Sequence, residues 1–95
     1  LYRNDSPGTY PPSWYAASAT PLPPRPPLAG AVRADVAVLG AGYTGLWAAR
    51  TLAAGGLRVV VLEAHRVGWG ASGRNGGQVH SGYNWDQPSL ERRIG

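Results

Sequence analysis

The sequence contains no cysteine, and this absence excludes disulfide bonds, thiolate catalysis and zinc sites built on cysteine. Its two histidines, His65 and His80, are too few to make a metal site. Each of them is expected to be a surface or loop residue. We therefore predict no metal cofactor.

Lysine is also absent, so all nine basic residues are arginines, and the formal net charge is +4. The arginines are scattered, with no run longer than two. Nucleic-acid recognition needs basic residues clustered on one face with interleaved aromatic side chains. We therefore expect no nucleic-acid partner, although the positive charge would help to attract a pyrophosphate.

No uninterrupted hydrophobic run is long enough to cross a membrane. The apolar stretch Val36–Ala54 approaches that length, but three glycines and Arg50 interrupt it. Such a pattern favours a strand, a turn and a helix. No secretory signal is visible, so the sequence predicts no membrane span and, by default, a cytoplasmic protein.

Residues 1–34 are expected to form a leader, because they contain eight of the nine prolines. Proline restricts its own backbone angle and that of the preceding residue, which favours an extended, polyproline-like strap. The segment WYAASA could form one helical turn, and Tyr10, Trp14 and Tyr15 could anchor the leader on the rest of the protein. The alternative is a disordered tail.

From residue 35 onward the pattern predicts an α/β fold. The apolar runs Val36–Leu39 and Val59–Leu62 are typical of buried parallel strands. Apolar residues at helical spacing predict a helix over 43–54, which Gly55 and Gly56 end. A right-handed crossover makes the two strands parallel neighbours.

These strands are too apolar for so small a unit, because one helix covers only one face of a sheet. A folded unit of about 60 residues is also only marginally stable by itself. The chain starts at Leu1, and it stops at ERRIG, where a helix could begin. We therefore expect residues 35–95 to be part of a larger domain, with the rest of that domain and the substrate domain absent.

The turn after the first strand carries a dinucleotide-binding fingerprint. Gly40 makes the tight turn, Gly42 lets the backbone approach a pyrophosphate, and Gly45 allows the helix to pack against the strand. The amides from about Gly42 to Gly45 would bind the phosphates at the helix N-terminus. Glu63, 18 residues after Gly45 at the end of the second strand, would accept hydrogen bonds from an adenosine ribose.

The fingerprint alone leaves FAD and NAD open, although the acid at Glu63 argues against the 2′-phosphate of NADP. HRVGWGASGRNGGQ, residues 65–78, is a second glycine-rich loop. It carries Ser72, Arg74 and Asn75 as polar contacts, and it favours a longer cofactor. Trp69 in this loop is expected to pack rather than to stack on a flavin.

The motifs GAGYTG and EAHRVGWGASGRNGGQ resemble the FAD-dependent amine and amino-acid oxidoreductases of the D-amino-acid oxidase superfamily. The leader WYAASATPLPPRPPLAGAVRADV is similar to that of the gamma-glutamylputrescine oxidases within it. The resemblance covers roughly residues 13–95 and implies the N-terminal β-α-β part of a Rossmann-like FAD-binding domain. It gives the expected cofactor-binding residues as Gly40, Ala41, Gly42, Tyr43, Thr44, Gly45, Glu63, Ala64, Arg66, Ser72, Arg74, Asn75, Gly77 and Gln78.

The resemblance also divides these residues among parts of FAD. The three fingerprint glycines would hold the pyrophosphate and Glu63 the ribose, with the Ala64 amide and Arg66 near the AMP half. The flavin side would be lined by Ser72, Arg74, Asn75 and Gly77, with Gln78 close to it. Non-covalent FAD is favoured, because there is no cysteine and no histidine stands within GASGRNGG. His80, just beyond, is the alternative point of attachment.

The implied function is oxidation of a C–N bond in a small amine or amino-acid substrate, within a larger enzyme. An NAD-linked dehydrogenase fragment and an inactive truncated product are the alternatives. The sequence identifies neither the catalytic residues nor the oligomeric state.

Overall fold

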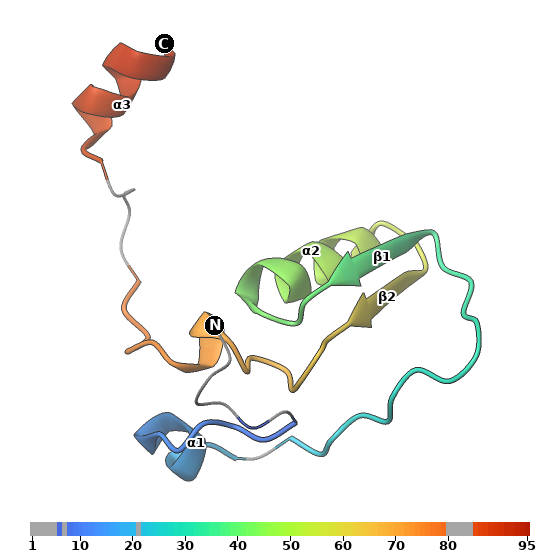
Figure 1. Ribbon diagram of the computed structural model, residues 1–95. Coiled ribbons are helices and arrows are strands. Elements are labelled where there is room, and N and C mark those ends of the chain that lie inside the picture. The colour runs from blue at the N-terminus through green and yellow to red at the C-terminus, as the bar shows by residue number, and fades with distance from the viewer. Residues whose placement is uncertain (1–5, 7, 21, 80–84) are drawn as a thin grey trace.

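The computed structural model describes residue 6 and residues 8–20, 22–79 and 85–95. Figure 1 shows a small sheet with one helix packed on it, and a leader that runs around this unit. The elements, in chain order, are helix α1 (Trp14–Ser18), strand β1 (Val36–Leu39), helix α2 (Tyr43–Ala54), strand β2 (Val59–Leu62), the 3-10 helix η1 (Ala71–Gly73) and helix α3 (Gln87–Ile94).

Strands β1 and β2 form a parallel two-stranded sheet, with Val36 beside Val59 and Leu39 beside Leu62. The predicted α/β fold and strand–helix–strand order are therefore confirmed. Both ends of the sheet are fastened by the backbone. The Gly40 amide donates to the carbonyl of Leu62 at 2.7 Å, and the Asp35 amide donates to that of Arg58 at 2.8 Å.

The Asp35 side chain also joins the strands, because its carboxylate pairs with the Arg58 guanidinium through two hydrogen bonds of 2.7 and 3.0 Å. The same carboxylate accepts a hydrogen bond from the Arg58 amide. These bonds hold the pKa of Asp35 below its usual value, with the guanidinium as the main cause. The pair is exposed to solvent, so water screens most of its stabilising effect.

Helix α2 ends through its two glycines, as predicted. The amide of Gly56 donates to the carbonyl of Ala53, and that of Leu57 donates to Leu52. Gly56 has φ +88°, a left-handed angle that glycine adopts at low cost. This pattern satisfies the last carbonyls of the helix and turns the chain into β2.

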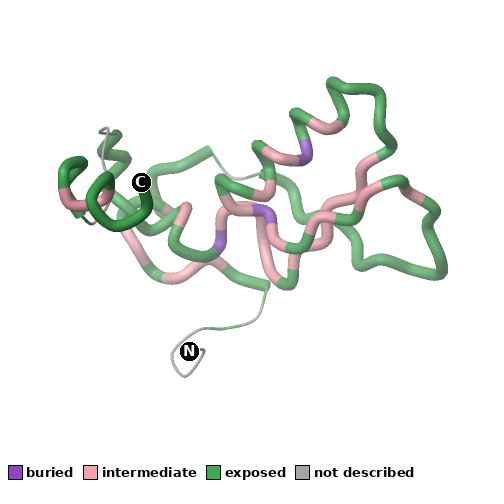
Figure 2. The backbone as a smooth tube through the Cα atoms, turned by 90° about the horizontal axis from the view of Figure 1, so that it is seen from above, coloured by how far each residue is buried: buried purple, intermediate pink, exposed green. Residues whose placement is uncertain are grey.

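The sheet is only partly buried. Among the described residues only Ala41, Ala49 and Trp69 are buried, and most of the chain is exposed or half-buried (Figure 2). Strand β1 alternates between half-buried and exposed residues, and Leu39 is 80% exposed. Among the described elements α2 is the one packed on the sheet, which agrees with the expectation that one helix covers only one face of strands this apolar.

The two terminal segments contain the short helices. Segment WYAASA forms α1 as predicted, with the Ser13 hydroxyl capping its first turn. Helix α3 begins at Gln87, four residues before the predicted ERRIG, because the Asp86 carboxylate caps the amide of Ser89. Residues 80–84, which include His80, lie outside the described part of the chain.

Candidate cofactor-binding site

The first glycine turn, residues 40–45, has the geometry that its sequence predicts. Gly40 has φ +96°, which sharply reverses the chain after β1. A side chain at Gly45 would overlap the carbonyl oxygen of Gly40. The two glycines therefore place the N-terminus of α2 directly against the end of the strand.

Gly42 is required for a contact that the sequence does not predict. A Cβ atom here would lie 2.9 Å from the Ser72 hydroxyl oxygen, and this oxygen accepts a hydrogen bond of 3.0 Å from the Tyr43 amide. Gly42 is the N-cap of α2 and provides no side-chain cap. Ser72 therefore caps the helix from the second glycine-rich loop, 29 residues away in sequence.

The second glycine-rich loop contains a second turn of the same kind. GWGASG, residues 68–73, has the glycine spacing of GAGYTG, residues 40–45. Gly68 has φ +71°, and a side chain at Gly73 would overlap the carbonyl oxygen of Gly68. The Gly68 amide donates to the Ala41 carbonyl at 2.9 Å, so the two turns are bonded together. Comparing the spacing of the two motifs would have revealed this repeat.

Glu63 lies at the end of β2 and its carboxylate faces the first glycine turn. One oxygen accepts a hydrogen bond of 2.7 Å from the Ala41 amide, and the other accepts one of 3.0 Å from the His65 amide. The Ala41 bond is the main reason why the pKa of Glu63 lies below its usual value, although partial burial opposes the shift. Each carboxylate oxygen can accept a further bond, so a ribose hydroxyl still has a partner here.

The remaining polar residues of the loop hold its own backbone. The amide nitrogen of Asn75 donates to the carbonyls of Ala71 and Ser72, and its oxygen accepts from the Gly77 amide. Arg74 donates to the Trp69 carbonyl at 3.0 Å, and its guanidinium lies 4.5 Å from the centre of the Trp69 ring. These contacts set the path of the loop, while Gln78 lies exposed at its end.

Arg66 is placed differently from the other predicted residues. Its guanidinium donates to the Leu22 carbonyl at 2.6 Å and lies 5.0 Å from the centre of the Tyr10 ring. Both partners belong to the leader. The structure therefore brings the fingerprint glycines, Glu63 and Ser72 together at the start of α2, and directs Arg66 to the leader. Ala64, another of the predicted cofactor-binding residues, lies exposed between Glu63 and His65.

Trp69 is a packing residue, as predicted. It is 8% exposed, its ring is stacked on His65 with centroids 4.0 Å apart, and its indole nitrogen donates to the Thr9 carbonyl at 2.6 Å. His65 is half-buried by this stack. A cavity of about 460 Å³ adjoins Trp69, between the leader, the start of α2 and the second glycine-rich loop.

The geometry at the start of α2 suits the diphosphate of a dinucleotide. The first amides of a helix have no acceptor inside the helix, and their dipoles favour an anion. No acidic side chain stands in the first turn. Gly42 and Gly45 leave no room for side chains. The Ser72 hydroxyl can donate a hydrogen bond to a phosphate, and the Glu63 carboxylate can accept one from a ribose hydroxyl. The residues present therefore fit an adenine dinucleotide.

The fold and this site define a dinucleotide-binding α/β unit. Residues 35–94 match the family of FAD dependent oxidoreductases, DAO. The chain belongs to this family, and its cofactor is FAD. The alternative of NAD is therefore not supported. No solved structure matches the chain.

Curated relatives share the same segment. Over 83 residues, 87% of this chain and 20% of the relative, the chain is 51% identical to gamma-glutamylputrescine oxidoreductase of Escherichia coli K12. It is 51% identical over 70 residues to a probable oxidoreductase, OrdL, of Rhizobium meliloti, covering 74% and 16% of the two chains. It is 50% identical over 48 residues to one component of the anaerobic glycerol-3-phosphate dehydrogenase of E. coli K12, or 50% and 9% of the two chains.

The chain thus spans about a fifth of the length of the first of these relatives. In the described part of the chain, no three potential metal ligands among His, Cys, Asp and Glu lie close together. None of the described helices combines the length and apolar character needed to span a bilayer.

Proposed function

We propose that this chain is the FAD-binding segment of an oxidoreductase that oxidises a C–N bond in a small amine or amino acid. The observation that carries the proposal is the convergence of the two glycine turns, Glu63 and Ser72 at the N-terminus of α2. When bound, FAD would supply the redox chemistry by accepting a hydride equivalent from the carbon beside the amine nitrogen. The protein's residues would bind and orient it.

Each part of this convergence has a role. The amides of Gly42, Thr44 and Gly45 would hold the pyrophosphate, while the Tyr43 amide is bonded to the Ser72 hydroxyl. The Glu63 carboxylate would accept a hydrogen bond from the adenosine ribose, and its bond to the Ala41 amide fixes the turn. Ala64 follows Glu63, so its amide would lie near the AMP half. We keep Arg66 near the AMP half as part of the proposal, with its guanidinium bonded to the Leu22 carbonyl of the leader. The flavin side would be lined by Ser72 and by the loop backbone as far as Gly77 and Gln78. Arg74 and Asn75 hold this backbone in place.

The extent of the similarity supports an amine substrate. The 83 residues shared with gamma-glutamylputrescine oxidoreductase exceed the 61 residues from 35 to 95 (95 − 34), so that similarity extends into the leader. The 48 residues shared with the glycerol-3-phosphate dehydrogenase component need not do so. The cofactor segment is common to relatives that are named for different substrates, so it does not distinguish between substrates. The longer match, to gamma-glutamylputrescine oxidoreductase, favours a substrate related to gamma-glutamylputrescine.

We also propose that FAD is held without a covalent bond. The chain has no cysteine, and His65 is stacked on Trp69 and accepts from the Gly8 amide at 3.4 Å. Unfolding the full-length protein should therefore release all of the FAD into solution. A cytoplasmic location, the division at residue 34 and inactivity of residues 1–95 by themselves stay predictions.

Anaerobic reduction of the bound flavin tests the substrate class without requiring knowledge of the electron acceptor. Full-length protein is mixed with gamma-glutamylputrescine, putrescine or glycerol 3-phosphate, and the yellow flavin absorbance is followed. We expect bleaching with gamma-glutamylputrescine and none with glycerol 3-phosphate. Bleaching by glycerol 3-phosphate alone would contradict the proposal.

A further inference from the structure

The leader is bonded to the second glycine-rich loop at several points. We call residues 8–20 and Leu22 the leader strap. The Tyr10 hydroxyl donates to the Val67 carbonyl at 2.8 Å, and Trp69 donates to the Thr9 carbonyl at 2.6 Å. These bonds join residues 57 and 60 positions apart in sequence. These two bonds fix the strap on the loop, and Figure 1 shows the path of both segments.

The Tyr10 bond ends on a backbone carbonyl of the loop, so it helps to set the path of the loop. The Trp69 bond runs the other way and fixes the backbone of the strap. Val67 immediately precedes the second glycine turn at Gly68, whose amide is bonded to the first turn. A shift of Val67 would therefore be passed to both turns. Tyr10 also lies half-buried beneath the Arg66 guanidinium, which adds a cation–π contact on the same side of the loop.

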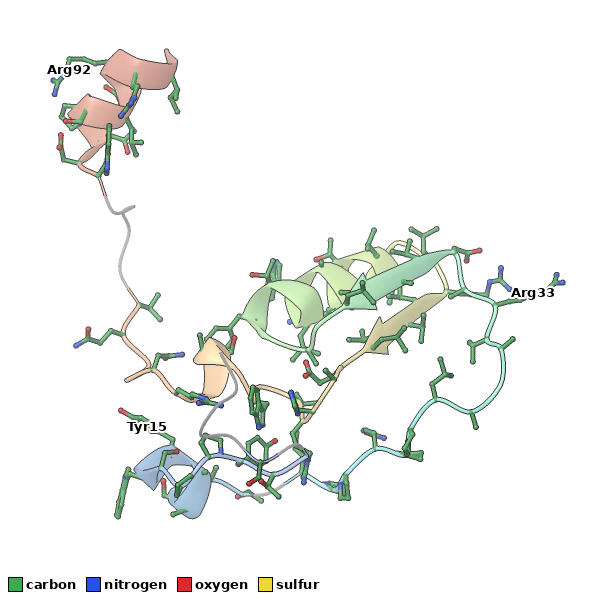
Figure 3. All side chains as sticks on the ribbon, viewed as in Figure 1. Tyr15, Arg33 and Arg92 are labelled. Carbon is green, nitrogen blue, oxygen red and sulfur yellow. The ribbon has the colours of Figure 1, made fainter. Side chains whose placement is uncertain are left out.

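The strap also reaches the end of the loop that is expected to contact the flavin. Tyr15 projects from α1 toward this loop (Figure 3), and its hydroxyl oxygen would lie 3.7 Å from a Cβ atom at Gly76. Gly76 lies between Asn75 and Gly77. The strap is therefore bonded to the loop at Val67 through Tyr10, and Tyr15 lies close to Gly76 at the other end of the loop, where both residues line the same cavity.

The cavity of about 460 Å³ lies between these two points of contact. Tyr10, Tyr15 and Leu22 line it from the strap, and Tyr43, Trp69 and Asn75 line it from the rest of the protein. Tyr43 is the first residue of α2, where the pyrophosphate would be held. Aromatic walls with a few polar groups suit a flat heterocycle with a hydrogen-bonding edge.

We propose that the leader strap is one wall of the FAD site, with Tyr10 and Tyr15 as positioning residues for the second glycine-rich loop. The cavity that the strap lines on one side takes the flavin half of FAD. This inference rests on the proposed function, and it assigns to the leader a role in cofactor binding.

Single hydroxyl deletions in the full-length protein test the inference. Tyr10→Phe removes the bond to Val67 and keeps the ring beneath Arg66, and Tyr15→Phe removes the hydroxyl near Gly76. Trp14→Phe is the matched control, because Trp14 lies on the same segment and is 79% exposed. Each variant is stripped of FAD and titrated with it, and the visible circular dichroism of the bound flavin is recorded.

We expect Tyr10→Phe to weaken FAD binding about threefold to tenfold, the range of one lost hydrogen bond. Its flavin dichroism should change, and Tyr15→Phe should change the dichroism at full occupancy. Trp14→Phe should match the parent. The inference is overturned if Tyr10→Phe lowers only the melting temperature of the FAD-free protein and leaves affinity and dichroism unchanged. A parent protein that binds no FAD overturns the proposed function as well, which distinguishes the two failures.

Discussion

The Glu63 carboxylate, at the end of β2, accepts a hydrogen bond of 2.7 Å from the Ala41 amide, in the turn that follows β1. The residue expected to bind the ribose therefore also fixes the glycine turn expected to bind the pyrophosphate. A substitution at Glu63 would therefore weaken binding of both the ribose and the pyrophosphate of the AMP half. Because of this dual role, removing the charge of Glu63 should change both the stability of the protein and its affinity for the cofactor.

Glu63→Gln should reduce the stability of the FAD-free protein by about 1 kcal/mol near neutral pH, because a half-exposed carboxylate loses charge-assisted bonds to two amides. The pKa of Glu63 is lowered in the folded state, chiefly by the Ala41 amide. Its contribution to stability is therefore complete above the unfolded pKa and disappears as the pH falls through the lower, folded pKa. The loss of stability in acid should be shallower in Glu63→Gln.

Urea unfolding at a series of pH values measures this difference. Glu91→Gln is the matched control, because Glu91 is an exposed carboxylate on α3 that accepts one bond from the Gln87 side chain. Equal pH profiles for the parent and Glu63→Gln would contradict the role assigned to the Ala41 bond.

Gly45→Ala and Gly73→Ala should each destabilise the protein by about 1–3 kcal/mol, since a methyl group would displace the backbone of a tight turn. In each case the methyl would overlap a glycine carbonyl oxygen, that of Gly40 or that of Gly68. Gly70→Ala is the control, because a Cβ atom there meets nothing within 4 Å and φ is −75°. Thermal unfolding of the three variants should separate Gly70→Ala from the other two.

Ser72→Ala should cost about 1 kcal/mol, the usual effect of losing a helix cap. Gly42→Ala should also be costly, since its methyl would lie 2.9 Å from the Ser72 hydroxyl oxygen. The double variant lacks that oxygen, so the methyl group at position 42 no longer meets it. The stability lost in the double variant should therefore be smaller than the sum of the losses in the two single variants. A double-mutant cycle in urea detects this coupling, and strict additivity would show that Ser72 does not cap α2.

The central unit could be predicted from the sequence because its signals are local. Val36–Leu39, 43–54 and Val59–Leu62 are the observed strands and helix, since each apolar run is bounded by glycine or by a change in polarity. The parallel pairing follows from the crossover rule. The mechanical roles of Gly40 and Gly45 follow from their spacing in the fingerprint.

Contacts between distant segments could not be predicted in the same way. The Ser72 cap on α2 and the bond from Tyr10 to Val67 join residues 29 and 57 positions apart, and no periodicity marks such pairs. The burial of each strand residue could not be predicted either, and Leu39 is 80% exposed. An apolar run indicates which residues favour burial, while actual burial depends on the elements packed against them.

The central claim is that this site holds FAD without a covalent bond, and the most direct test is to identify the nucleotide that the full-length protein carries. The purified protein is denatured by heat, and the supernatant is separated by chromatography beside FAD and NAD standards. We predict one equivalent of FAD per chain in the supernatant and none left on the precipitate. NAD in the supernatant, or a colourless protein that cannot be reconstituted with FAD, would contradict the account.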